Sequence, residues 1–87
     1  MEKRIIENGE FEYELLLSRN ELADVLRDLA DQISKESRLK ISSTDWEIPF
    51  EFQEPLKLKI DFEGNGKKKL KIKIEFKSKN ITKINIE

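Results

Sequence analysis

The sequence predicts an α+β fold in which one helix packs on one face of a largely antiparallel sheet of about five strands, as a two-layer sandwich. Three observations predict it. Apolar and charged residues alternate in several short segments, which is the period of a half-buried strand. One segment instead repeats its apolar residues every three or four positions, as an amphipathic helix does. The segments after it are joined by short turns, which favour antiparallel neighbours.

The first strand is predicted over residues 11–17. Its apolar positions are Phe11, Tyr13, Leu15 and Leu17, and Glu12 and Glu14 lie between them. Before it, Asn8-Gly9 is a turn signal, so Ile5-Ile6 is expected to fold back as a short strand.

The helix is predicted to begin after Ser18 and to end near Glu36. Ser18 and Glu21 match a capping box, in which each residue hydrogen-bonds the backbone of the other. Its apolar stripe consists of Leu22, Val25, Leu26, Leu29 and Ile33. Acidic residues line the opposite face: Glu21, Asp24, Asp28 and Asp31.

Residues 39–41 alternate briefly, and four further strands are predicted at residues 46–52, 56–63, 69–77 and 84–86. Because Pro49 cannot donate to a ladder, the strand that contains it is expected to be at an edge or broken there. One buried cluster is expected to join helix and sheet: Leu22, Leu26, Leu29, Ile33, Leu58, Ile60, Ile72 and Ile74.

The strongest hairpin is predicted around Gly64-Asn65-Gly66. The apolar residues are even-numbered on both of its strands, so facing residue numbers must sum to an even number. A three-residue loop with Gly66 in the left-handed region keeps this parity and pairs Glu63 with Lys67.

Composition restricts the chemistry. The 87 residues are expected to form one domain over residues 1–87, with a thin core and no deep substrate cavity. The chain has no Cys and no His, which removes thiolate chemistry, disulfides and the commonest general base and metal ligand. We therefore expect no catalytic residue, no cofactor and no metal. We also expect that the protein is not an enzyme. Asp45, Glu47 and Glu51 offer oxygen ligands for calcium or magnesium, but they lack EF-hand spacing, and solvated surface is the favoured interpretation.

Compartment and partners follow from the same composition. No run of residues is long and apolar enough to span a membrane, and residues 1–7 have no apolar leader, so we expect a small soluble cytoplasmic domain without a membrane partner. The high Lys, Glu and Ile content resembles that of thermophile proteins. No small-molecule substrate is evident.

Charge is unevenly distributed along the chain. Residues 66–87 hold eight Lys and two Glu, a net charge of +6, whereas residues 1–65 carry −7. Six lysines are expected to share one face of the hairpin: Lys57, Lys59, Lys69, Lys71, Lys73 and Lys77. Asp61, Glu63 and Glu75 share that face and dilute it.

Such a face suits phosphates, but it lacks exposed aromatic rings for stacking bases, because Phe62 and Phe76 are expected to point inward. The alternative is that these lysines keep an open sheet face soluble and discourage edge pairing.

The order of these segments resembles the Amphi-Trp domain family, a group of small, mostly archaeal and bacterial proteins of uncharacterised function. The resemblance covers residues 11–77. It is best over Ser18-Arg19, Glu21-Leu22-Ala23 and Leu29-Ala30-Asp31, which are followed by Pro55 and two long amphipathic strands. Phe76 stands where the family has the Trp that names it, and Trp46 lies in a different strand. The resemblance implies no catalytic residue.

The sequence thus predicts a non-enzymatic small interaction module of unknown role. A protein partner or self-association, with the acidic helix face meeting the Lys-rich face, is one hypothesis. The alternative is a nucleic-acid-binding or ribosome-associated protein that uses the Lys-rich hairpin face.

Overall fold

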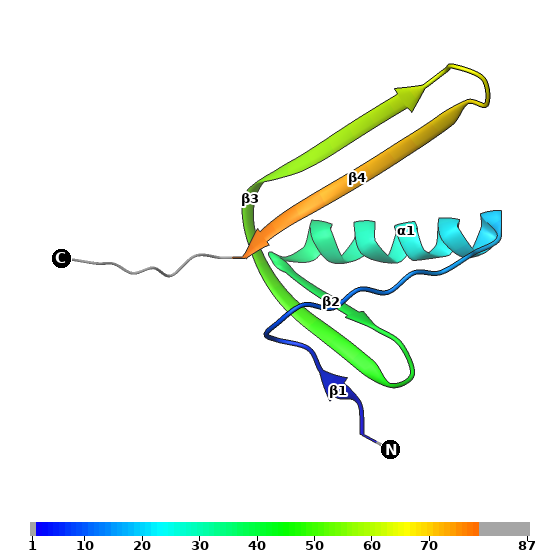
Figure 1. Cartoon of the computed structure of the whole chain (residues 1–87). Helices are drawn as coiled ribbons and strands as arrows, with labels where there is room; N and C mark the ends of the chain where they lie inside the picture. Colours follow the sequence, from blue (N-terminus) through cyan, green and yellow to red (C-terminus); the bar gives the residue numbers. More distant parts are fainter. Residues whose placement is uncertain (1, 79–87) are drawn as a thin grey trace. The chain divides into compact units, whose positions relative to one another are not determined.

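The structure is a computed structural model that describes residues 2–78, in which one helix and four strands form (Figure 1). In chain order these are β1 (Arg4–Ile5), α1 (Arg19–Lys35), β2 (Arg38–Ser42), β3 (Trp46–Glu63) and β4 (Lys69–Ser78). The α+β class predicted from the sequence is therefore confirmed. The chain divides into two compact units, Met1–Glu51 and Phe52–Glu87, and β3 contributes to both.

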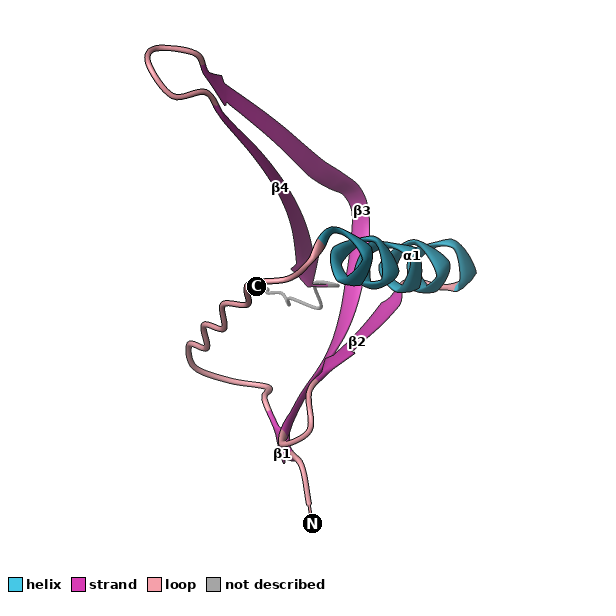
Figure 2. Cartoon of the chain, turned by 90° about the vertical axis from the view of Figure 1, so that its right-hand side faces the viewer, coloured by secondary structure: helices cyan, strands magenta, loops and turns pink. Residues whose placement is uncertain are grey.

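The strand count and the sheet differ in detail from the prediction. The two strands predicted at 46–52 and 56–63 are the halves of one continuous strand, β3. Its first half pairs in parallel with β1 and antiparallel with β2, so the sheet is mixed (Figure 2). Its second half pairs with β4. The strand predicted at 84–86 lies outside the described residues.

The strand that contains Pro49 is neither an edge strand nor broken there, contrary to the prediction: β3 runs through Pro49 and lies between β1 and β2. The backbone N–H groups of Arg4 and Ile6 donate to the carbonyls of Asp45 and Glu47, at 3.1 and 2.8 Å. Alternate residues of a strand turn their backbone groups to the same side, so the nitrogen of Pro49 faces the side of β3 that β1 occupies. The next hydrogen bond of this parallel ladder would need the N–H that Pro49 lacks, and β1 ends opposite Glu47.

The prediction of a strand at residues 11–17 is wrong, because this segment pairs with no strand among the described residues. Its alternation instead directs aromatic rings to one side. The rings of Phe11 and Tyr13 each lie with their centroid 4.9 Å from that of Trp46. The residues that follow are exposed, Leu16 by 94%. The short strand expected before this segment forms as β1, but it pairs with β3.

The helix begins and ends where the sequence predicted. Ser18 is the N-cap: its hydroxyl accepts the N–H of Glu21 at 3.2 Å, and its own N–H donates to the Glu21 carboxylate at 2.9 Å. These two bonds satisfy backbone donors that a helix start otherwise leaves open. The last helical residue is Lys35, followed by Glu36 as the C-cap.

The hairpin keeps the predicted parity but not the predicted register. Leu58 pairs with Ile74, Ile60 with Ile72 and Phe62 with Leu70, so facing residue numbers sum to an even number. Glu63 pairs with Lys69, not with Lys67, and the loop therefore spans residues 64–68. Parity fixes which residues share a face, but it leaves the loop length free to change by two residues.

The predicted buried cluster draws its residues from both units, and none of its members is buried within its own unit. Only Leu39 and Phe52 are buried among the described residues, at 2% and 3% exposure. Leu29 and Ile33 are half-buried, and the other members of the cluster are exposed: Leu22, Leu26, Leu58, Ile60, Ile72 and Ile74. In the first unit α1 packs against β2 alone, and in the second unit the described residues supply no layer over the hairpin.

Gly66 has the predicted positive φ, +71°, and a Cβ added there would meet no atom within 4 Å. A substitution should therefore act through the backbone alone. We expect Gly66→Val to lower the free energy of unfolding by more than about 1 kcal/mol, because a β-branched residue resists the left-handed region. Gly66→Asn is the matched control and should cost less than about half as much, since Asn enters that region more easily. Equal losses for Val and Asn in urea melts would contradict this explanation.

Candidate functional site

The hairpin ladder gathers the predicted lysines on one face. Four cross-strand pairs lie on it: Lys57 with Glu75, Lys59 with Lys73, Asp61 with Lys71, and Glu63 with Lys69. Facing residues of a ladder point to the same side, so five of the six predicted lysines share this surface, which we call the Lys face. Lys77 pairs with Gln53, beyond an irregularity in register between Gln53 and Lys57.

Most charges on the Lys face are balanced within the hairpin. Three of its four pairs join a lysine to an acid, and the Lys57 ammonium lies 4.0 Å from the Glu75 carboxylate. Opposite charges across a ladder stabilise the pairing modestly, and like charges oppose it. Lys59 and Lys73 alone bring two like charges directly opposite each other. The face therefore offers one uncompensated cationic pair and not a continuous basic stripe.

The other face of the hairpin is apolar and exposed. Three pairs form it, and its six side chains expose between 44% and 68% of their surface. They are Leu58, Ile60, Phe62, Leu70, Ile72 and Ile74, and we call them the apolar face. Exposed apolar patches of this kind typically mark interaction surfaces.

Phe62 and Phe76, which were both expected to point inward, differ in their exposure. Phe62, expected to point into a core, is 68% exposed near the loop end of the hairpin. Phe76 is half-buried at the opposite end, where its ring lies 5.2 Å from the ring of buried Phe52. The apolar face is thus closed at one end by a ring pair and open towards the loop.

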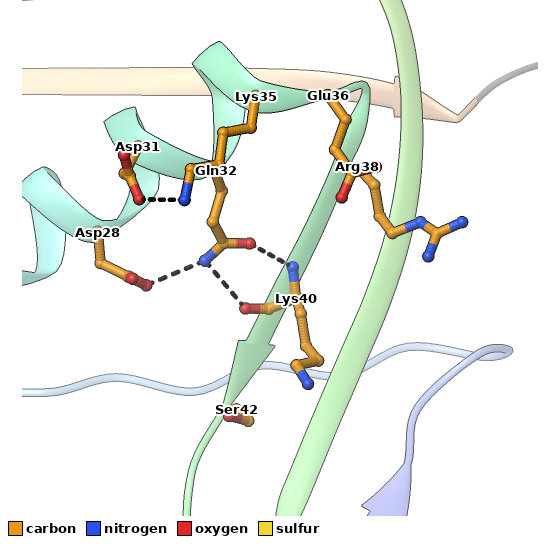
Figure 3. A pocket seen from close by; sticks show the side chains of 8 residues that line it. All are labelled: Asp28, Asp31, Gln32, Lys35, Glu36, Arg38, Lys40 and Ser42. Atoms are coloured by element: carbon orange, nitrogen blue, oxygen red, sulfur yellow. Dashed lines mark hydrogen bonds and ion pairs between the residues drawn. The ribbon is translucent and has the colours of Figure 1, made fainter.

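A groove in the first unit lies between the last turns of α1 and β2, with a volume of about 580 Å³ (Figure 3). Gln32 dominates it. The side-chain oxygen of Gln32 accepts the backbone N–H of Lys40 at 2.7 Å, and its nitrogen donates to the Lys40 carbonyl at 3.2 Å and to Asp28 at 2.9 Å. Lys40 faces Pro49, whose backbone groups point away from β2. Gln32 therefore satisfies the outer edge of β2, as another strand would.

The sequence pattern does not single out Gln32. The one local signal is its spacing from Asp28, because a Gln and an Asp four residues apart on a helix form a favourable pair. Its contact with Lys40 depends on how the chain returns after the helix, which the sequence pattern does not fix. The groove is lined by polar groups that bond one another, so it offers chemistry for holding α1 on β2 and no free reactive pair.

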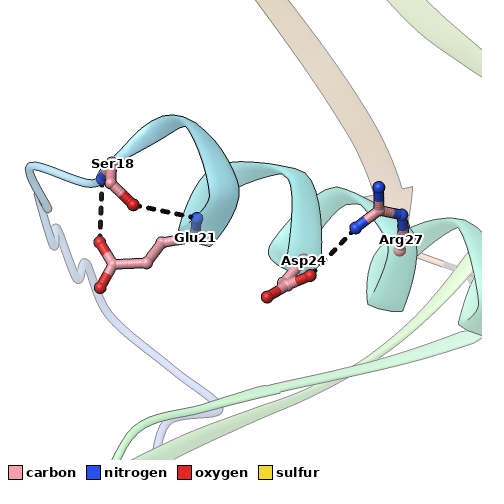
Figure 4. A network of polar contacts seen from close by, with 4 residues as sticks. All are labelled: Ser18, Glu21, Asp24 and Arg27. Carbon is pink, nitrogen blue, oxygen red and sulfur yellow. Dashed lines mark hydrogen bonds and ion pairs between the residues drawn. The ribbon is translucent and has the colours of Figure 1, made fainter.

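The acidic face of the helix is largely neutralised by its own neighbours. Arg27 contacts Asp24 at 3.0 Å, close to the capping pair of Ser18 and Glu21 (Figure 4). Lys35 lies 3.1 Å from Asp31. These pairs are exposed and contribute little to stability, but they reduce the negative potential that this face presents to a basic partner.

Acidic residues do not converge elsewhere in the described part of the chain. Within residues 2–78 no group of three Asp or Glu side chains lies close enough to hold a metal ion, and Glu51 instead pairs with Arg38 at 3.1 Å. Among the same residues, α1 is neither long nor apolar enough to cross a membrane.

The order of elements and the two amphipathic strands of the hairpin agree with a family match. The Amphi-Trp domain family matches residues 5–80. The chain belongs to the Amphi-Trp domain family. No curated protein and no solved structure matches it. In this Amphi-Trp chain Phe76 packs on Phe52 at the closed end of the apolar face.

The two hydrogen bonds between the Gln32 side chain and the Lys40 backbone lead to a stability prediction. Gln32→Ala should lower the free energy of unfolding by about 1–2 kcal/mol, because two hydrogen bonds to the edge of β2 are lost. Arg27→Ala is the matched control on the same helix and should cost less than about 0.5 kcal/mol, since its ion pair is exposed. Denaturant melts of both variants give the comparison. A loss for Gln32→Ala no larger than that of the control would contradict the role of Gln32.

Proposed function

We propose that this Amphi-Trp chain is a non-enzymatic interaction module whose contact surface is the apolar face of the β3–β4 hairpin. One observation carries the proposal: six large apolar side chains lie on one side of a two-stranded ladder and expose 44–68% of their surface. An isolated two-stranded hairpin is marginally stable in water, and a hydrophobic face needs a further layer. A binding partner would supply that layer.

The polar chemistry of the chain supports a binding role over catalysis. The whole sequence has neither Cys nor His. The carboxylates of Asp24, Asp28 and Asp31 are engaged with neighbouring cations or amides, which does not favour a pair of acids in contrasting environments for general acid–base work. A chain without cysteine also suits a reducing compartment such as the cytoplasm.

A capture experiment tests the contact surface. Tagged wild-type protein should retain partner proteins from a native lysate, and Ile60→Ser/Ile72→Ser should lose most of them, because both substitutions remove apolar contact area. The double variant Lys59→Ser/Lys73→Ser is the matched control, since it changes the neighbouring residues on the opposite face, and should retain them. Nuclease treatment should not change the result. Retention that is lost only with the Lys variant, or only after nuclease, would contradict the proposal.

The second candidate function is contact with nucleic acid through the Lys face, favoured by the facing pair Lys59 and Lys73. Because the other lysines of that face have acidic partners, only about two phosphates should be neutralised. For single-stranded RNA, replacing both lysines with Gln should make the slope of log K against log salt shallower by about 1.4 units. Fluorescence anisotropy over a salt series measures this slope. The control Lys69→Gln should change it little, and an unchanged slope in the double variant would remove this candidate.

A further inference from the structure

We propose that the partner of the apolar face is a second copy of this chain, and that two hairpins pack face to face about a two-fold axis. The inference rests on the proposed function, because it names the occupant of the same surface. In this arrangement the apolar faces form the interior of a two-layer β-sandwich, and the two Lys faces point outward.

The exposed area is of the size that a stable dimer needs. Six large side chains that expose about half to two-thirds of their surface present roughly 600 Å² of apolar area per copy. A specific interface buries about 800 Å² per partner, and the largest apolar patch on a monomer is about 300–600 Å². Residues around the patch would add the remainder. The patch therefore approaches the area of a complete interface.

The β4 edge of the hairpin disfavours edge-to-edge pairing, the other common way for strands to associate. Lysines recur along β4 at Lys69, Lys71, Lys73 and Lys77. If two β4 edges paired antiparallel, lysines of one copy would lie against lysines of the other, and like charges across a ladder oppose pairing. Lysine on an edge strand is a recognised protection against such pairing. Association through the face avoids this repulsion and buries no charged side chain.

The rows of the apolar face complement themselves when one copy is turned over the other. The middle row, Ile60 and Ile72, lies on the axis and meets its own copy. Phe62 then lies over Leu58 of the second copy, and Leu70 lies over Ile74. Phe62 thus meets a smaller side chain, and Leu70 meets one of equal size, which keeps the spacing of the two layers even at about 10 Å.

The test uses purified full-length chain. Light scattering behind size exclusion, from about 1 to 200 μM, should give twice the 10.3 kDa mass of one chain at the higher concentrations. Ile60→Ser/Ile72→Ser should weaken dimerisation by at least about tenfold, and Lys59→Ser/Lys73→Ser should leave it unchanged. Circular dichroism confirms that each variant is folded.

Single thiols locate the contact, because the chain has no native cysteine. Under mild oxidation Ile72→Cys should form an interchain disulfide, and the neighbouring Lys73→Cys, on the opposite face, should not. A dimer that the Ile double variant leaves intact overturns the proposal.

A monomer at all concentrations also overturns self-association, and thiol labelling then separates two cases. If Ile72→Cys reacts with a maleimide as fast as Lys73→Cys, the apolar face is open and the proposed interaction function stands with a different partner. If Ile72→Cys is protected in the monomer, the chain covers the face itself, and the proposed function fails as well.

Discussion

Strict alternation along β3 and β4 is the constraint on which the surface chemistry of this protein depends. Side chains of a strand point alternately to its two sides, so charged and apolar residues are separated completely once the register has even parity. A two-stranded ribbon has no interior in which to hide its apolar side. The described residues of its own unit bury only Phe52, which leaves six apolar side chains in contact with solvent. Because the apolar side chains lie on one side of the hairpin and its own unit adds no layer over them, that side is available as a contact surface.

The Lys face has a different physical role from the one its composition suggests. Counting lysines along the sequence indicates a basic stripe, but the ladder places an acid opposite three of them. Cross-strand pairs of opposite charge help to hold the hairpin in register and keep its outer side hydrated. Among the cross-strand pairs of the Lys face, the uncompensated charge lies at Lys59 and Lys73. Contact between this face and a polyanion would thus depend on two ammonium groups, whereas burial of the opposite face involves six apolar side chains.

Features that depend on neighbouring residues were predictable from the sequence. The capping box at Ser18, the left-handed Gly66 and the parity of the hairpin all follow from short-range chemistry, and the structure has all three. Pairings between distant segments were not predictable. Residues 11–17 alternate as a strand does, yet alternation does not specify a partner edge, and their rings pack on Trp46 instead. The hydrogen bonds between Gln32 and Lys40 likewise depend on how the chain after α1 turns back to place β2 beside the helix, and no local sequence pattern predicts this.

Phe76 shows how the apolar face is bounded. It lies on β4 in the same alternation as Ile72 and Ile74, but its ring packs on Phe52, whereas Ile72 is exposed. An aromatic pair at this end ties the two strands together next to the register irregularity, where the regular ladder cannot do so. Phe76 therefore anchors the hairpin and does not belong to its open surface. A large ring at this point fixes the end of the ladder, and the three apolar pairs beyond it remain free to contact a partner.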